Sequence, residues 1–588
     1  MALAEYETQH IEAMRQIAPE CMVLLKSNGD FPLESAQKVA LYGNGARHTI
    51  KGGTGSGDVN SRFYVTCEYG LKKAGFFITT DKWLDGYDEV ATNHKQEFIK
   101  QMKAEAKAAK ISPMMYAMGK VVPESEYELP IDGEGDVCIY VVARNSGEGN
   151  DRKPESGDIK LTASEKRDIL KCQKQYKKFM LVLNVGGVLD LSDVSEVENI
   201  LVLSQLGVST GDALADVILG KSYPSGKLTT TWSAWADYSS IGEFGDKNET
   251  RYKEGVYVGY RYFDSVGKKA LYPFGFGLGY TTFSIEKERV SVEKTKVVVT
   301  CKVKNTGNTK GKEVVQLYVT CPWKKLDQPY QKLCAYKKTK ELEAGEEVRM
   351  ELSFGLEEIA SYNEDIASYI LEEGQYILRL GNSSASTKEA AALLLKEDVV
   401  VRKLKRVGGN TDFKDFVPEK TWSDVAEDAT EVIELEKEAF ASLVWPKPME
   451  VSKRAKDFVA ALSDEELVFL NIGQFENKPG SSSVIGTQSK RVAGAAGESC
   501  SRIKGIDPII MADGPAGLRL NKEYVRTKDG VKPVGDTMPD WFADYLPGVA
   551  KFAIEKVINR KPSKDVYTQY CTAIPIGTAL AQSWNDEV

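Results

Sequence analysis

Histidine is scarce in this chain of 588 residues, and its scarcity limits the available chemistry. The three histidines are His10, His48 and His94, so the last 494 positions contain none. Zinc sites and Ser-His-Asp relays both draw on histidine, and here there is little from which to build either. We therefore expect no metal site, and no cofactor is predicted.

The sequence also lacks paired cysteines and long apolar runs. Its nine cysteines include no CxxC pair, and their odd number without a framework indicates reduced thiols. No apolar run approaches the roughly 20 residues that cross a bilayer. The first residues, "MALAEYETQHIEAMRQ", are acidic and amphipathic, unlike a signal peptide. These features predict a cytoplasmic protein without a membrane partner.

An excess of positive charge is likewise missing. The net charge of -8 gives no long-range attraction to nucleic acid, so no nucleic-acid partner is expected. The composition, 42% hydrophobic and 28% charged, is that of a globular protein. The length predicts several domains, each able to bury its own core.

The first 221 residues alternate between apolar runs and helical patterns. A helical pattern in this part, "TASEKRDILKCQKQYKKF", opens with Thr162 and Glu165 at capping-box spacing. Buried β-runs alternating with helices predict a mainly parallel sheet covered on both faces, an α/β/α sandwich over 1–221. The runs are "VALYG" (39–43), "VCIYVVAR" (137–144), "FMLVLNVGG" (179–187) and "NILVLSQLG" (199–207).

The remaining chain divides by composition into four stretches. Residues 222–284 are rich in Gly, Pro and aromatics, which predicts an extended connector packed on its neighbours. Short alternating β-runs separated by turn signals predict an immunoglobulin-like or fibronectin type III-like sandwich over 285–400. Residues 401–451 are charged and mixed, as in a linker. Helix signals return in 452–588, which ends in "AIPIGTALAQSWNDEV" without a closing turn, and we expect an interrupted domain there.

The loop "KGGTGSGDVN" (51–60) follows an apolar run and raises the question of phosphate binding. A Walker loop needs a lysine where this loop has Asp58, and the GxGxxG spacing fails. Two interpretations stay open. The glycines form a tight turn, or Ser56, Asp58 and free amides hydrogen-bond a neutral ligand such as a sugar.

The loop "ARNSGEGNDRKPESGD" (143–158) follows the second long apolar run. Loops after parallel strands commonly carry functional groups, and Glu148 lies between two glycines that allow a substrate to approach closely. The alternative is a solvated acidic loop. Arg144 and Arg152 would lower the pKa of this carboxyl, so a general acid here requires burial.

The third candidate is "MADGPAGLRL" (511–520), which follows the apolar run "PIIMA". Asp513 and Arg519 at the end of a barrel strand could bind a polyol through charge-assisted hydrogen bonds. An ordinary salt-bridged turn is the alternative, because the residues DGP also favour a turn.

These motifs together resemble glycoside hydrolase family 3, which contains many β-glucosidases. The resemblance runs through nearly the whole chain and implies a permuted domain order, in which the sandwich and the fibronectin-like domain precede a (β/α)8 catalytic barrel begun at 452–588. It rests on "ECMVLLKSNGDFPL", "KGGTGSGDVN", "SGEGNDRKP", "SGKLTTTW", "VGYRYFDS", "YPFGFGLGYTTF", "GAAGES", "ADGPAGLRL" and "AIPIGTALAQSWNDEV".

The resemblance also implies roles for four residues. Glu148 corresponds to the general acid/base and Ser56 to a serine that contacts the sugar. Asp513 corresponds to an aspartate that binds sugar hydroxyls, and Arg519 to an arginine that lines the same site. The implied activity is retaining hydrolysis of terminal non-reducing β-D-glucosyl residues by double displacement, with a β-glucoside or small oligosaccharide as substrate.

The chain departs from the family pattern in the barrel. The nucleophilic aspartate of an SDW-like motif and a Lys-His pair are both absent, and 452–588 is shorter than the about 250 residues of a complete barrel. We expect a fragment, inactive alone, or a chain completed by a second one; a homodimer is also open. The alternatives are a non-catalytic sugar-binding or assembly subunit and a nucleotide-binding α/β protein. For the aromatic insertion at 521–568 two interpretations stay open: it shapes the aglycone side of the site, or its aromatic side chains pack within the insertion.

Overall fold

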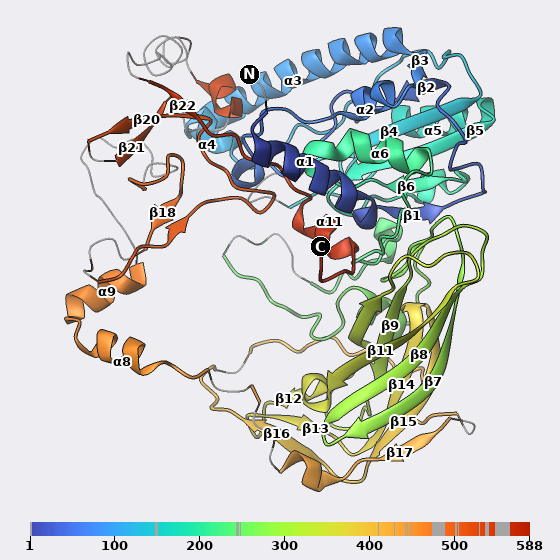
Figure 1. Cartoon of the computed structure of the whole chain (residues 1–588), viewed down its shortest axis with the longest axis vertical. Helices are drawn as coiled ribbons and strands as arrows, with labels where there is room; N and C mark the ends of the chain where they lie inside the picture. Colours follow the sequence, from blue (N-terminus) through green and yellow to red (C-terminus); the bar gives the residue numbers. More distant parts are fainter. Residues whose placement is uncertain are drawn as a thin grey trace.

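We describe the fold from a computed structural model of the chain (Figure 1). It places an α/β domain beside a β-sandwich, and a C-terminal segment leads from the sandwich back to the α/β domain. Among the described residues, no helix has the length and apolar composition that a bilayer crossing requires. The structure describes residues 3–588 except 147–150, 243–245, 247, 410, 428–429, 442, 444, 447–448, 473–488, 500–502, 504, 529, 535–539, 547 and 549–564.

The α/β domain is built on a six-stranded sheet in the order β1-β6-β5-β4-β2-β3. Only β1 runs antiparallel, against β6. The chain passes from β2 to one neighbour, β3, and then to the other, β4, so the sheet has a topological switch point between β2 and β4. The strands are β1 (Val23–Lys26), β2 (Lys38–Tyr42), β3 (Phe77–Ile78), β4 (Val137–Arg144), β5 (Lys178–Val185) and β6 (Ile200–Val202).

Helices cover this sheet. The predicted capping box opens α5, where the Thr162 hydroxyl accepts from the Glu165 amide at 3.0 Å and the Glu165 carboxylate accepts from the Thr162 amide at 2.8 Å. The strands β4 and β5 are almost wholly buried, as their continuous apolar sequences require. The helices are α1 (Glu5–Ile17), α2 (Cys67–Lys73), α3 (Asp81–Ala109), α4 (Pro113–Ala117), α5 (Ala163–Gln175) and α6 (Thr210–Ile218).

The second domain is a mainly antiparallel sandwich that follows a connector containing α7 (Tyr260–Ser265). A five-stranded sheet, β10-β9-β14-β15-β17, shares its core with the three-stranded sheet β11-β8-β7, and β12-β13-β16 form a further small sheet. Residues 401–451, expected as a linker, place β17 beside β15, and Phe440 is buried in the sandwich core. The strands are β7 (Phe283–Glu293), β8 (Lys296–Asn305), β9 (Val314–Thr320), β10 (Lys332–Lys338), β11 (Glu347–Gly355), β12 (Ser361–Asn363), β13 (Ser368–Leu371), β14 (Gly374–Ser383), β15 (Ser386–Leu395), β16 (Val399–Lys403) and β17 (Val432–Glu434).

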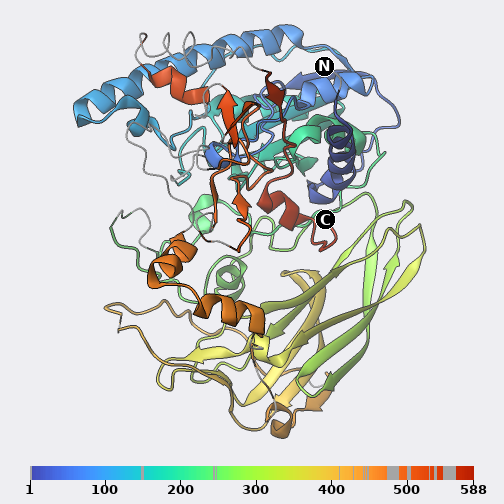
Figure 2. The ribbon, with the colours of Figure 1, turned by 60° about the vertical axis from the view of Figure 1, so that its left-hand side comes forward.

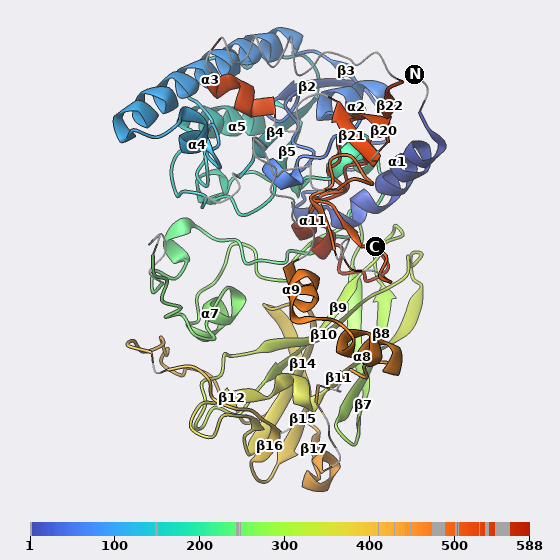
Figure 3. The same cartoon turned by 90° about the vertical axis from the view of Figure 1, so that its left-hand side faces the viewer.

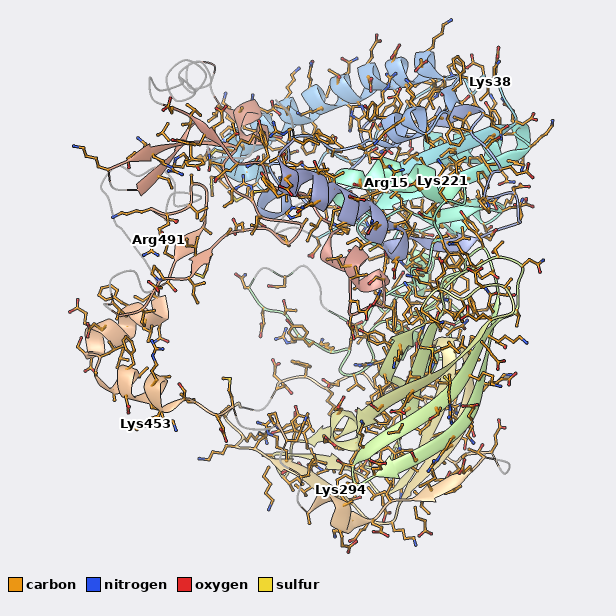
Figure 4. The ribbon with its side chains drawn as sticks, in the orientation of Figure 1. Arg15, Lys38, Lys221, Lys294, Lys453 and Arg491 are labelled. Carbon is orange, nitrogen blue, oxygen red and sulfur yellow. The ribbon has the colours of Figure 1, made fainter. Side chains whose placement is uncertain are left out.

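The C-terminal segment arches from the sandwich to the α/β domain (Figure 2, Figure 3). The first two helices of this segment, α8 and α9, contain no buried residue. Figure 4 shows Lys453 and Arg491 on the arch, far from Arg15 of the α/β domain. The described strands pair antiparallel and show no closed barrel, so the expected start of a barrel is not confirmed. The elements are α8 (Lys453–Ala460), α9 (Asp464–Ile472), β18 (Gly497–Glu498), β19 (Ile510–Met511), β20 (Glu523–Thr527), β21 (Gly530–Val534), β22 (Tyr567–Thr568) and α11 (Gly577–Gln582).

Residues around α11 lie where all three parts meet. Gln582 accepts a hydrogen bond from Ser204 of the α/β domain, and the Trp584 indole donates to the carbonyl oxygen of Lys227 in the connector. On the sandwich side, the Lys338 ammonium donates to the Ser583 carbonyl oxygen at 2.8 Å. The segment 577–588 is therefore anchored to both neighbouring domains.

Glu20 joins the same three parts through charge. Its carboxylate lies 2.7 Å from the Lys312 ammonium and 2.9 Å from that of Lys338, and it accepts from the Asn585 amide. Burial alone would raise the pKa of Glu20, but the charges and hydrogen bonds of the two lysines outweigh it and lower the pKa to about 2.

We expect this junction to weaken in acid. A carboxyl with a lowered folded-state pKa contributes stability above pH 4.5, and that contribution is lost as the pH falls toward about 2. After solvent screening of the partly exposed carboxyl, we expect Glu20 to contribute about 1–2 kcal/mol to the free energy of unfolding. This contribution is the difference in the free energy of unfolding between the wild type and Glu20→Gln, measured by urea unfolding at pH 7 and at pH 3. An equal gap between the two proteins at both pH values would contradict the assignment.

Candidate functional site

The glycine-rich loop after β2 forms a short 3-10 turn, Gly55–Gly57, that carries Ser56. The Lys51 ammonium lies 2.8 Å from the Asp58 carboxylate, so the loop contains an ion pair in place of an open cationic cradle for phosphate. Gly52 and Gly57 are buried, and a Cβ built on them would lie 3.4 Å from the Ala516 Cβ and 3.6 Å from the Pro515 Cγ. The loop therefore packs against the turn at 513–517, at distances where an added Cβ would make ordinary van der Waals contacts.

Asp513 begins that turn, and Arg519 lies two residues after its end. The Arg519 amide donates to the Asp513 carbonyl oxygen at 2.8 Å, and no ion pair joins these two described side chains. The Arg519 Nε is buried and has no hydrogen-bond partner among the described residues. A buried donor without a partner is costly, so a ligand oxygen would satisfy it.

The loop predicted to carry the acid/base flanks the same region. Glu148 itself is one of the residues 147–150 that lie outside the described part of the chain. Just before them, the Ser146 carbonyl oxygen accepts from the Thr54 hydroxyl at 3.0 Å. The loop of Ser56 and the loop that contains position 148 are therefore tied together at the carboxyl ends of β2 and β4.

Both arginines expected to lower the pKa of Glu148 have other partners. Arg144 is 5% exposed and forms two hydrogen bonds with the Glu165 carboxylate, at 2.9 and 2.6 Å. The Arg152 Nε donates to Asp158 at 2.7 Å. Each guanidinium charge is thus largely compensated by a carboxylate at hydrogen-bonding distance.

The sequence analysis missed the strand-like stretch 572–576, which joins the turn to the α/β domain. The Ile574 amide donates to the Ala516 carbonyl oxygen, and the Ala573 carbonyl oxygen accepts from Val208. The Ile576 amide then donates to the carbonyl oxygen of Gln205. The short apolar pattern "AIPIG" was the available signal, but no periodicity in it identifies its distant partners.

Replacing Gly517 should disturb this joint. Its φ is +113°, and a Cβ would lie 2.3 Å from the Thr572 carbonyl oxygen and 3.3 Å from the Val59 Cγ2. We expect Gly517→Ala to destabilise the joint by about 1–3 kcal/mol, because both the backbone conformation and the contact become strained. We expect this destabilisation to appear as faster hydrogen exchange at the Ile574 amide.

Gly408→Ala is the matched control, because a Cβ at Gly408 has no neighbour within 4 Å. Exchange at Ile574 should keep the wild-type rate in this control. A wild-type rate in Gly517→Ala as well would contradict the proposed strain at the joint.

Comparison with known protein families identifies two regions. Residues 22–280 match the glycosyl hydrolase family 3 C-terminal domain, and residues 313–384 match a fibronectin type III-like domain. These matches confirm the family resemblance and the predicted α/β sandwich and fibronectin type III-like domain. Neither match covers the segment 452–588.

Individual proteins extend the comparison. The chain is 29% identical over 542 residues to a β-glucosidase of Ruminococcus albus, covering 87% of this chain and 55% of that protein. A β-glucosidase structure from Paenibacillus barengoltzii aligns with a TM-score of 0.70 at 26% identity, over 88% of this chain and 59% of that chain. The structure of β-glucosidase 3B from Thermotoga neapolitana in complex with glycerol aligns with a TM-score of 0.58 at 31% identity. The alignment covers 67% of this chain and 55% of that chain. The chain thus spans little more than half the length of these relatives.

Proposed function

We propose that this chain, which carries the glycosyl hydrolase family 3 C-terminal domain followed by a fibronectin type III-like domain, supplies the acid/base and sugar-binding part of a retaining β-glucosidase. The relatives it matches bear the name β-glucosidase. The substrate is a β-glucoside or a small oligosaccharide, with the terminal glucosyl residue removed.

One observation carries this proposal. Three segments far apart in sequence meet at one edge of the parallel sheet: the loop of Ser56, the root of the loop containing position 148, and the turn of Asp513. The Thr54–Ser146 hydrogen bond joins the first two, and the close approach of Gly57 to Pro515 joins the first to the third. A sugar site needs several converging polar groups, and this arrangement brings them together.

The mechanism assigns each residue a role. Glu148 protonates the leaving oxygen as the glycosidic bond breaks and then takes a proton from the water that hydrolyses the glycosyl-enzyme. Retention requires a second carboxylate, about 5–5.5 Å from the first, as nucleophile. Ser56, Asp513 and Arg519 hydrogen-bond the hydroxyls of the sugar, and the unpartnered Arg519 Nε is a donor for this task.

We propose that the nucleophile comes from a barrel remainder outside this sequence. We propose that 452–588 begins that barrel, after the α/β and fibronectin-like domains. The alignment with the Ruminococcus albus enzyme supports this order, because an alignment over 87% of the chain cannot omit all of 452–588. The remainder would belong to a longer form of the chain or to a second chain, and a homodimer is a further possibility.

The experiment is an assay of the purified 588-residue chain on an aryl β-glucoside, with D-glucose binding measured in parallel. We expect glucose binding without hydrolysis, and hydrolysis once the barrel remainder is supplied. Clear hydrolysis by the chain alone would refute the need for a separate nucleophile. Binding without hydrolysis even after complementation would favour a non-catalytic sugar-binding subunit.

A nucleotide-binding protein is the remaining alternative. The Lys51–Asp58 ion pair in the glycine-rich loop disfavours it, because a phosphate would meet a carboxylate there. Thermal unfolding with ATP, NAD and glucose separates the two, and only glucose should raise Tm.

We also propose a cytoplasmic location, supported by described cysteines that are all free thiols.

A further inference from the structure

A cavity of about 650 Å³ lies next to the candidate sugar site, and Ser146 lines it. Its described walls come from α3, from residues 119–125, from 143–146 and from 151–158, and none of its described lining residues belongs to 51–58 or 513–519. Asn44 after β2 and Ala143 at the end of β4 form part of its floor. The cavity therefore lies at the topological switch point of the sheet, where open α/β sheets bind ligands.

The polar centre of the cavity is Glu124. Its carboxylate accepts from the Tyr87 hydroxyl at 2.7 Å and from the Asn44 amide at 2.5 Å. Burial, and then the nearby charge of Glu165, raise the pKa of Glu124 to about 7 against the opposing charge of Arg144. Near neutral pH this carboxyl exists in both protonation states, so it can accept or donate a hydrogen bond.

Part of the remaining lining is apolar, and the rest carries polar groups and charges of both signs. Phe98, Met102 and Val122 line one side, and Met102 is only 4% exposed. Lys120, Lys153 and Glu105 are all lining residues. Hydrogen bonds from Gln101 and Tyr116, and then the charges of the two lysines, lower the pKa of Glu105. Because cations and anions are interspersed, the cavity offers no field that favours a ligand of one charge.

We propose that this cavity is a second binding site, which takes a neutral, hydroxyl-bearing ligand of mono- or disaccharide size. Its volume lies in the usual range for small-molecule sites, about 300–1,000 Å³. A sugar combines an apolar C–H face, which suits the Phe98 side, with hydroxyls that suit Glu124. A strongly charged ligand would meet a like charge in the lining and a buried carboxyl on the floor.

Occupation of the cavity would act on residues 151–158, the described second half of the loop. The Glu124 amide donates to the Gly157 carbonyl oxygen at 3.0 Å, and a Cβ on Gly157 would lie 2.3 Å from the Glu124 carbonyl oxygen. The loop is thus held directly against the wall that carries Glu124. A ligand in this site contacts residues 151–158, and none of the described residues that line the cavity belongs to 51–58 or 513–519.

The test is calorimetric titration of the 588-residue chain with cellobiose and with D-glucose, in a background of Asp513→Asn that weakens the candidate sugar site. Phe98→Ala removes the apolar wall, and Ala91→Phe, at another lining residue, fills the cavity. Lys100→Ala is the control, because Lys100 is exposed on α3 and lies outside the lining. The chemical shift of the Met102 methyl group reports occupancy directly, and matched Tm values show that the variants fold.

We expect sugar binding to survive Asp513→Asn and Lys100→Ala, and to weaken at least tenfold in Phe98→Ala and Ala91→Phe. Two results would overturn the cavity proposal. The first is sugar binding that disappears with Asp513→Asn alone. The second is a Met102 methyl shift that does not move up to about 10 mM sugar, a concentration that would fill a site with a millimolar Kd. The first of those results would leave the proposed function standing. Retention in Asp513→Asn with loss in Ala91→Phe would support the cavity whatever the outcome for catalysis.

Discussion

Replacing Glu148 with alanine should lower turnover of an alkyl β-glucoside by about 10²–10⁴-fold in the enzyme completed with its barrel remainder. An alkoxide is a poor leaving group, so its departure depends on the proton that Glu148 is proposed to supply. An aryl glucoside with an acidic phenol needs less help in the first step and should lose less kcat/KM. Steady-state kinetics on the two substrates measure the difference.

Azide supplies a second measurement for this residue. A small anion can enter the space left by the side chain and attack the glycosyl-enzyme without general-base help, so added azide should restore turnover of the aryl substrate. Asp151→Ala is the matched control, because Asp151 is an exposed carboxylate of the same loop. Unchanged turnover of the alkyl glucoside in Glu148→Ala would refute the acid/base role.

Arg144→Ala should lower the free energy of unfolding by about 3–5 kcal/mol, the largest stability effect expected in this chain. Arg144 and Glu165 are 5% and 2% exposed, and two hydrogen bonds join them. Removing the guanidinium leaves a buried carboxylate without its counter-charge, and it also removes the hydrogen bond to the Asp158 carbonyl oxygen. Urea unfolding followed by circular dichroism gives the change.

Two further variants isolate the cause. Arg349→Ala breaks an exposed ion pair with Glu288 and should cost less than about 1 kcal/mol. The double variant Arg144→Met/Glu165→Met removes both charges, so it should recover most of the loss. A double variant as unstable as Arg144→Ala would mean that lost packing, and not an unpaired charge, destabilises the protein.

Features with a local physical cause were readable from the sequence. The continuous apolar runs of β4 and β5 predicted buried parallel strands, and both strands are buried and paired in parallel. The Thr162–Glu165 spacing predicted a capping box, and the Glu165 amide donates to the Thr162 hydroxyl. Periodicity and capping depend on residues within one or two turns, so no distant contact was needed to recognise them.

Long-range contacts were not readable in this way. Glu124 lies in no motif, and its role follows from Asn44 and Tyr87, which the fold brings to it from other elements. The antiparallel pairing of β18 with β19 was missed because two-residue strands have no measurable period. For Ser56, Asp513 and Arg519 the sequence supplied the residues, and only the folded chain placed their segments side by side.

The anchoring of 577–588 to both domains has a consequence for synthesis. The strand β10, which carries Lys338, leaves the ribosome about 240 residues before α11, an interval of about 12–50 s at about 5–20 residues per second. During that time the buried ammonium of Lys338 has Glu20 but not the Ser583 carbonyl oxygen, and the Lys227 carbonyl oxygen awaits Trp584. The nascent sandwich and the α/β domain are therefore each folded on their own core before residues 577–588 are synthesised and join the two domains.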